Sequence, residues 1–455
     1  MINKAESPLF WSASKNFLFI LIIFLASRLP FLYSGFGTDP DAWRMVLASR
    51  QIFETGQYSP SRLPGFPVPE YTYSLLFNYT GGKPSPVLFN FITALFSLAA
   101  VYFFYLILIR LNYKNVYPVL LCFIFTPLFY INSVNSMDYN WAMAFILASF
   151  YFCLSDKQLI SGILLGIAAG SRISSLAFLI PFNFWIIYSD RFPANLKRSF
   201  NFNLSALLVT SMVYFPVYSL YGLNLFSYDK LIYPAFLTVG GRMTVKVWGV
   251  IGTVSISAVV LFILFRRKRL QNENESSEHK KITLIILIII AIYFLLFLRL
   301  PVESGYLLPA IPFFLILIAK YLTRNISIFL AASLAISSFI LNIDRKGFEL
   351  VGPVWKDHLT RMTEIQSANL AIDKAKKLNT GNYRIISEGY LPKIKVEGLI
   401  KNSESQVIDK FIYLPAPSEI DSMRDSGITI YYLMNAREGI SLFYNDSLFA
   451  KMKAF

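Results

Sequence analysis

Charged residues and cysteines are scarce in this chain of 455 residues. Asp, Glu, Lys and Arg together make up 15% of it, whereas hydrophobic residues make up 55%, and the mean hydropathy is +0.52. A soluble domain carries nearer a quarter charged residues, so this composition excludes an ordinary soluble protein. The two cysteines, Cys122 and Cys153, lie within apolar runs, which excludes a disulfide framework and a Cys-rich metal site.

Histidines are also few, and internal repeats are lacking. His279 and His358 lie in polar segments far apart in the sequence, so they predict no metal site. The net charge of +15 comes from basic residues in short clusters between apolar runs. Such clusters are typical of orientation signals in membrane proteins, and they argue against nucleic-acid binding. No small-residue cleavage pattern follows the first apolar run, which indicates an uncleaved membrane anchor.

Apolar runs long enough to span a membrane recur along the chain. A spanning helix needs roughly 20 apolar residues, and shorter ones are tolerated inside a bundle. We therefore predict a mainly α-helical, polytopic membrane bundle of about eleven transmembrane helices. The candidate segments are 17–33, 86–108, 116–132, 140–154, 159–171, 174–188, 203–221, 247–265, 282–298, 305–319 and 326–342.

The segments on either side of Arg172 are the ambiguous pair, because each is short. If they formed one helix, the basic cluster 266–269 would be translocated, against the positive-inside rule. Two helices leave that cluster and the N-terminus in the cytoplasm. The first loop, 34–85, and the tail, 344–455, then lie outside.

The chain is thus predicted to have two domains. Residues 1–343 form the transmembrane domain with the first outer loop, and residues 344–455 form a small extracytoplasmic α/β domain. In the tail, the patterns predict an amphipathic helix over 357–377 and strands over 383–387, 411–414 and 428–433.

The first outer loop opens with two carboxylates. Asp39 suits a helix N-cap and Pro40 the first helical position, and the helix should end before Gly56. Met45, Val46, Ser49, Ile52 and Phe53 form one apolar stripe, which is typical of a helix on a membrane surface. These two carboxylates, Asp41 and Asp39, are the leading candidates for functional residues in this loop.

Further candidates for substrate binding come from several loops and one helix break. The proline-rich stretch SPSRLPGFPVPE predicts a rigid, irregular loop, and ionisable groups near a bilayer are costly and so suggest function. The glycines at 162, 166 and 170 line one helix face and predict close helix packing. The substrate-binding candidates are Arg62, Glu70, Asp138, Arg172, Arg242, Arg299, Glu303 and Tyr306.

Three of these motifs, in this order, resemble a known family. The acidic residue followed by Arg50 and Gly56, the sequence GILLGIAAGSR at 162–172 and the sequence GYLLPAIP at 305–312 are similar to the GT-C glycosyltransferases, especially the protein mannosyltransferase and aminoarabinose transferase group. The chain departs from the group's pattern in three places. An Asp-Pro-Asp stands where an Asp-Glu pair is usual, Arg172 replaces a lysine, and Gly305 replaces an arginine.

The resemblance implies an inverting glycosyltransferase that uses a polyprenyl-phosphate sugar as its donor, in a bacterial inner or plasma membrane. Asp41 or Asp39 would deprotonate the acceptor, which is a glycan, a lipid or a protein. Arg62 and Arg172 lead the cations that would stabilise the departing phosphate, and Asp138 would orient the sugar or the acceptor. The scheme requires no cofactor and no metal, although acidic loops are compatible with a divalent ion. The expected partners are this donor, the acceptor and membrane lipids, without nucleic acid.

Other classes of membrane protein remain as alternatives. A polymerase or ligase of lipid-linked glycans is also polytopic, but its main external loop is expected late in the chain. A transporter often contains paired halves, and no internal repeat is visible here. A non-catalytic scaffold is the fourth class.

Overall fold

The computed structural model describes residues 8–188, 194–226, 233–270, 277–344, 347–378, 382–403, 405–436 and 439–443. The chain divides into two units. The bundle unit comprises Met1–Tyr33, Leu63–Pro69 and Asn90–Asp357, and the sheet unit comprises Ser34–Arg62, Glu70–Phe89 and His358–Phe455. The first loop therefore contributes mainly to the same unit as the C-terminal segment.

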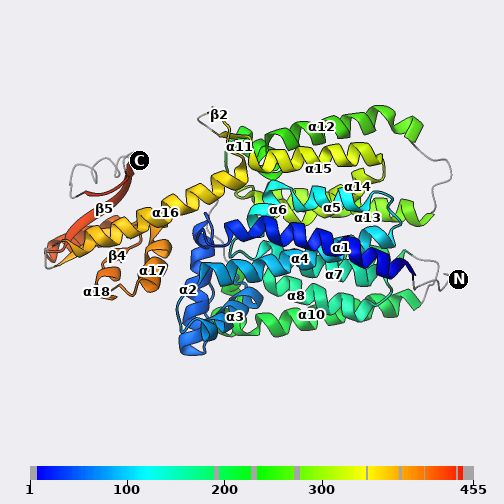
Figure 1. Ribbon diagram of the computed structural model, residues 1–455. Coiled ribbons are helices and arrows are strands. Elements are labelled where there is room, and N and C mark those ends of the chain that lie inside the picture. Colours follow the sequence, from blue (N-terminus) through cyan, green and yellow to red (C-terminus); the bar gives the residue numbers. More distant parts are fainter. Residues whose placement is uncertain are drawn as a thin grey trace. The chain divides into compact units, whose positions relative to one another are not determined.

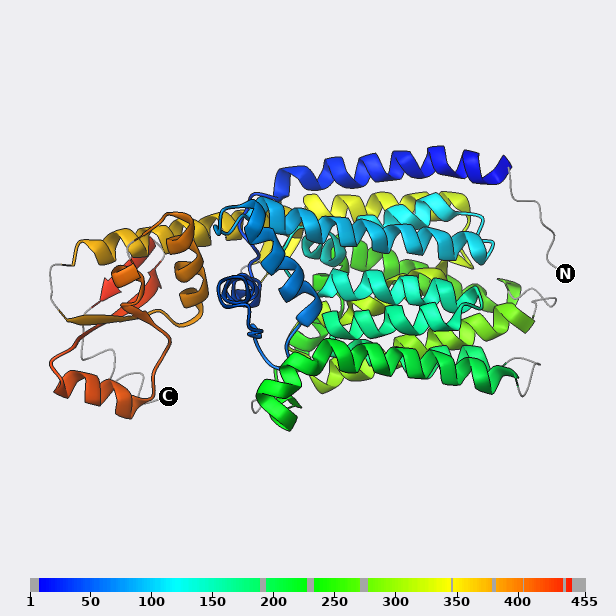
Figure 2. The same ribbon diagram turned by 90° about the horizontal axis from the view of Figure 1, so that it is seen from below.

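Within the bundle unit, long helices run side by side (Figures 1 and 2). Each apolar segment expected from the sequence falls on a helix or on two consecutive helical pieces. The α-helices are α1 (Pro8–Arg28), α4 (Pro86–Arg110), α5 (Val116–Ile124), α6 (Pro127–Asn132), α7 (Tyr139–Leu154), α8 (Gln158–Ser171), α9 (Leu179–Ile187), α10 (Ala194–Tyr221), α11 (Phe236–Met243), α12 (Val245–Leu270), α13 (Ser277–Arg299), α14 (Ile311–Ala319) and α15 (Arg324–Phe339). The remaining elements of this unit are 3-10 helices at Leu29–Phe31, Ile173–Phe178, Gly222–Phe226 and Ser304–Ala310 and the antiparallel strands β1 (Asn342–Asp344) and β2 (Gly347–Glu349).

Among the described residues, four helices are long and apolar enough to cross a membrane, namely those within Pro86–Arg110, Asn195–Leu225, Val245–Phe265 and Ser277–Arg299. Shorter apolar helices accompany them. The chain is accordingly an integral membrane protein.

Several helices extend beyond the apolar segments that predicted them. Lys197 and Arg198, which precede the predicted segment 203–221, lie in the first turns of α10, and Lys280 and Lys281, which precede the predicted segment 282–298, lie in α13. Hydropathy marks the apolar part of a helix, whereas long basic side chains can continue the helix and direct their charge to the edge of the apolar layer. The ammonium of Lys281 lies 4.2 Å from the centre of the Trp185 ring.

The glycine face of α8 packs against α10, and this confirms the expected close helix contact. A Cβ atom at Gly166 would lie 2.6 Å from Val209 Cβ and 2.8 Å from the carbonyl oxygen of Ala206. A Cβ at Gly162 would overlap the backbone of Phe202. Small residues at these positions let the two backbones approach each other, as at many membrane helix contacts.

We expect Gly166→Ala to lower the free energy of unfolding by about 1–3 kcal/mol, because the added methyl group overpacks a backbone contact. Unfolding by SDS titration in mixed micelles measures this change. Gly240→Ala is the matched control, since a Cβ at Gly240 meets no atom within 4 Å. Equal stability of the two variants would contradict the packing role.

The sheet unit combines helices from the first loop with the C-terminal elements. Its helices are α2 (Pro40–Thr55), most of α3 (Pro67–Leu76) and of α16 (Pro353–Lys376), α17 (Leu391–Ile400), α18 (Ser405–Ile408) and α19 (Pro417–Asp425), with 3-10 helices at Phe77–Tyr79 and Glu388–Tyr390. Its strands are β3 (Tyr383–Ile386), β4 (Phe411–Ile412), β5 (Thr429–Ala436) and β6 (Gly439–Phe443), in the order β4-β3-β5-β6. Strand β3 is parallel to β4 and β5, and β6 is antiparallel to β5.

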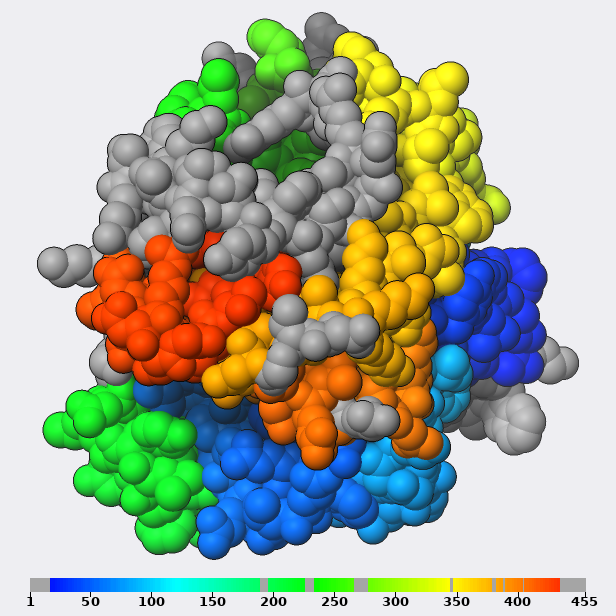
Figure 3. All heavy atoms as spheres, turned by 90° about the vertical axis from the view of Figure 1, so that its left-hand side faces the viewer, coloured from blue at the N-terminus to red at the C-terminus, as the bar shows by residue number. Residues whose placement is uncertain are grey.

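The α2 helix packs on α17 within this unit. In Figure 3, the orange side chains of the C-terminal segment border the blue side chains of the first loop. Trp43, Val46 and Ile52 of α2 are buried, whereas Phe53, which the sequence placed on the apolar stripe, is 37% exposed. The start of α3 corrects a second expectation, because Pro67–Glu70 form its first turn instead of an irregular loop. Prolines are tolerated there, since the first amides of a helix have no intrahelical partner.

Glu397 on α17 makes the sheet unit sensitive to pH. Burial raises the pKa of its carboxyl from 4.5 to about 6, against the smaller opposing effects of a hydrogen bond with Asn369 and of Lys401. Between these two pH values the folded state binds more protons than the unfolded state, so stability falls as the pH rises from 4.5 to 6.

We expect Glu397→Gln to remove about 2 kcal/mol of this pH dependence, since one pKa unit corresponds to about 1.4 kcal/mol. The measurement is hydrogen exchange of the peptide 391–400 across this pH range, corrected for the intrinsic exchange rate. Asp425→Asn, at an exposed position of α19, serves as control. An unchanged pH dependence in Glu397→Gln would show that Glu397 is not the responsible group.

Candidate functional site

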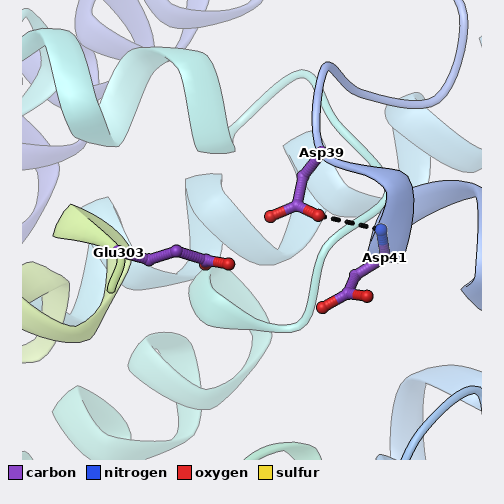
Figure 4. Close-up of side chains that lie close together, drawn as sticks. All are labelled: Asp39, Asp41 and Glu303. Carbon is purple, nitrogen blue, oxygen red and sulfur yellow. Dashed lines mark hydrogen bonds between the residues drawn. The ribbon is translucent and has the colours of Figure 1, made fainter. Parts of the chain in front are cut away.

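Most of the predicted site residues fall into two groups, one within each unit. In the sheet unit, α2 begins as the sequence predicted, with Asp39 as N-cap and Pro40 at the first position. The Asp39 Oδ1 atom accepts a hydrogen bond of 2.8 Å from the Asp41 backbone N–H (Figure 4). Gly56, with φ of +69°, ends the helix in the left-handed conformation that glycine adopts without strain. The two caps fix where the carboxylates stand.

Asp41 is held by two guanidinium groups. Its Oδ1 accepts from Arg44 Nη1 at 2.8 Å, and its Oδ2 lies 2.7 Å from Arg62 Nη1. The Asp41 residue is 9% exposed, while the side chains of Arg44 and Arg62 are 38% and 30% exposed. Arg62, which the sequence named as a substrate-binding candidate, therefore pairs with Asp41, and Arg44 is an additional partner. Sequence reasoning missed Arg44, although its place one helical turn after Asp41 is the signal that indicates such a pair.

Glu70 is fully buried, and its carboxylate holds the segment that carries Arg62. One oxygen accepts from the Ser61 backbone N–H at 2.7 Å, and the other accepts a short hydrogen bond from the Tyr58 hydroxyl. Both contacts lie just before Arg62 in the chain. The sequence had suggested that Glu70 binds a substrate. Its contacts instead suit a residue that orients Arg62.

The second group lies in the bundle unit and centres on a buried ion pair. Asp138 stands at the N-cap position of α7 without capping its backbone, and its Oδ2 lies 2.5 Å from Arg172 Nη1. Arg172 follows the end of α8 in an extended conformation, with φ of −158° and ψ of 112°. The side chain of Asp138 is 1% exposed and that of Arg172 is 12% exposed. The helix break at Arg172 thus brings its guanidinium to the start of α7.

Two tyrosines and a glutamate complete this second group. The Arg172 guanidinium lies 4.0 Å from the centre of the Tyr139 ring and 4.8 Å from that of Tyr306. The Tyr139 hydroxyl donates to Glu303 Oε2. A Cβ atom at residue 305 would lie 2.6 Å from Tyr139 Cζ, so the glycine at this position leaves room for the ring. The structure therefore brings together Asp138, Arg172, Glu303 and Tyr306, which the sequence had named separately.

Tyr139 was missed in the sequence, because an aromatic residue beside a helix start is also typical of a membrane interface. The two remaining candidates lie outside this group among the described residues. Arg242 donates from Nη1 to the Pro301 carbonyl oxygen at 2.5 Å, and Arg299 is the exposed last residue of α13.

Both groups pair a carboxylate with guanidinium side chains. The chemical uses of such an arrangement are to accept a proton at the carboxylate and to bind an anion at the guanidinium, because arginine donates several hydrogen bonds in a geometry that matches phosphate. In the bundle group, the only acceptor that Arg172 has among the described residues is Asp138. Guanidinium N–H groups of Arg172 therefore remain for another acceptor.

Comparison with known proteins bears on the fold. No family model matches the sequence, and no curated protein matches it either. The crystal structure of ArnT from Cupriavidus metallidurans in the apo state superposes with a TM-score of 0.58 and 11% identity, over 98% of this chain and 95% of that chain. ArnT from the same organism bound to undecaprenyl phosphate gives a TM-score of 0.57 and 12% identity, over 99% and 96% of the two chains. The chain therefore has the fold of these two ArnT structures, as its sequence motifs had indicated.

Proposed function

We propose that the chain transfers a sugar from a polyprenyl-phosphate donor to an acceptor on the outer face of the membrane, with inversion at the anomeric carbon. The observation that carries this proposal is Asp41, whose two carboxylate oxygens are each held by an arginine at the start of α2. The ArnT fold supports it, since one of the two similar structures contains undecaprenyl phosphate.

In the proposed reaction, the acceptor O–H attacks the anomeric carbon from the face opposite the phosphate. Asp41, or Asp39 in its place, takes the proton as general base. The bond between the anomeric carbon and the phosphate oxygen breaks, and polyprenyl phosphate leaves with the electron pair. Arg62 and Arg172 are proposed to stabilise the phosphate charge, and Asp138 to orient Arg172. None of these steps needs a metal.

The orientation in the membrane is part of the proposal. The N-terminus would lie in the cytoplasm, a bundle of about eleven spans would cross a bacterial inner or plasma membrane, and residues 344–455 would form a small α/β domain outside. The basic clusters between apolar segments support this orientation through the positive-inside rule.

A transfer assay with the purified chain in proteoliposomes tests the proposal. The donors are labelled sugars on polyprenyl monophosphate, with a polyprenyl diphosphate glycan as the donor that a polymerase or ligase would use. We expect acceptor-dependent release of polyprenyl phosphate from a monophosphate donor. Turnover of the diphosphate donor alone would favour the ligase class. Movement of intact lipid between leaflets, with every donor unchanged, would favour a transporter and contradict the proposal.

A further inference from the structure

The turn that precedes α2 is tied to the C-terminal segment by one buried lysine. Lys393 of α17 is 4% exposed, and its ammonium donates to the Thr38 carbonyl oxygen at 3.2 Å. Thr38 directly precedes Asp39, the N-cap of α2. This contact lies wholly within the sheet unit.

The ammonium itself is fixed by a second contact. Glu364 of α16 accepts from Lys393 Nζ at 2.6 Å, and its side chain is 19% exposed. A buried charge is costly unless it is paired and hydrogen-bonded, so the pair confines the ammonium to one place. Lys393 thereby links α16 and α17 to the Thr38 carbonyl.

The same turn is held from the other side by α2. The indole N–H of the buried Trp43 donates to the Gly37 carbonyl oxygen at 2.7 Å. The carbonyls of two consecutive residues, Gly37 and Thr38, thus accept hydrogen bonds from side chains of two different helices. Together these bonds restrict the backbone just before Asp39 and Asp41.

We infer that Lys393 is a positioning residue for the acidic turn Asp39–Asp41, which places the catalytic carboxylate under the control of the C-terminal segment. This inference rests on the proposed function. The lysine touches no reacting atom, and it acts by holding the Thr38 carbonyl. A displacement of the carboxylate by about 1 Å from its acceptor can lower the rate about 100-fold. A hydrogen bond that holds the residue before the N-cap is therefore expected to have a large effect on turnover.

The test compares Lys393→Met, Lys393→Arg and Lys356→Met in the full-length protein in nanodiscs. Lys356→Met is the matched control, because Lys356 of α16 pairs with Glu349 and both residues belong to the bundle unit, whereas the turn belongs to the sheet unit. Two readouts are taken, namely hydrogen exchange of the peptide 34–45 and the kinetics of sugar transfer at varied donor concentration.

We expect Lys393→Met to raise the exchange rate of this peptide about 10-fold, since the opening of a tethered turn governs exchange. Turnover should fall about 100-fold with the KM for the donor unchanged, and Lys393→Arg should restore most of both. The control should leave both readouts at wild-type values. A merely structural lysine would lower the amount of folded enzyme without separating turnover from KM.

Exchange at the wild-type rate in Lys393→Met would overturn the inference, and so would wild-type turnover. If the wild-type protein transfers no sugar from any polyprenyl-phosphate donor, the proposed function fails by itself. The exchange measurement then still decides whether Lys393 holds the turn, so the two failures are distinct.

Discussion

Replacement of Asp41 by asparagine is expected to lower the turnover number for sugar transfer about 1,000-fold, because general-base catalysis contributes roughly 10²–10⁴ to rate. Asparagine keeps the size of the side chain and cannot take the proton. Initial rates with a labelled polyprenyl-phosphate sugar measure the effect. Glu54→Gln is the matched control, since Glu54 pairs with Arg50 on the exposed end of the same helix.

Asp39→Asn separates the two aspartates. Asparagine is as good an N-cap as aspartate, so α2 keeps its start and the variant reports on chemistry alone. If Asp39 only caps the helix, we expect its rate to stay within about threefold of the wild type, because a retained cap changes little. The opposite pattern, a large loss in Asp39→Asn and none in Asp41→Asn, would assign the base to Asp39. Full activity of both variants would exclude the carboxylate mechanism.

Arg172→Met is expected to have the largest effect on stability. It leaves the Asp138 carboxylate buried without its cation, and breaking a buried ion pair by removing one partner costs about 3–5 kcal/mol. Unfolding titrations in mixed micelles measure this loss. The pair of the partly exposed Arg198 with the exposed Asp156 provides the control, and Arg198→Met should change stability by less than about 1 kcal/mol.

A double-mutant cycle tests whether this loss reflects the pair itself. Asp138→Leu combined with Arg172→Met removes both charges, and the double variant should be more stable than Arg172→Met alone. Losses that simply add would mean that the two side chains do not interact energetically. In the transfer assay, the double variant should remain inactive however stable it is, because the proposed phosphate contact is gone.

Apolar runs and local caps were sufficient to predict much of the fold. The run 140–154 became α7, which begins one residue earlier, and the pattern around Asp39, Pro40 and Gly56 predicted both ends of α2. These features depend on neighbouring residues only, and neighbours are what a sequence shows directly. The break at Arg172 was recognised in the same way, from a charge within an apolar stretch.

The contacts between distant segments could not be predicted. Nothing local indicates that Gly305 faces the Tyr139 ring, or that Glu303 accepts from its hydroxyl. Lys393 lies in a helix whose lysines and glutamate are also typical of a solvated surface, and its partner is in the first loop. The domain boundary at residue 343 stays a prediction, while contacts group residues 34–62 with the C-terminal segment.

The hydrogen bond from Lys393 to Thr38 joins residues 355 positions apart. During synthesis, the ribosome makes Asp39 and Asp41 long before the helix that steadies them exists. The bundle helices α1 and α4 to α15 can therefore be complete while the acidic turn still lacks this contact. We therefore expect a stop after residue 350 to leave the bundle helices α1 and α4 to α15 in place and to abolish the proposed sugar transfer.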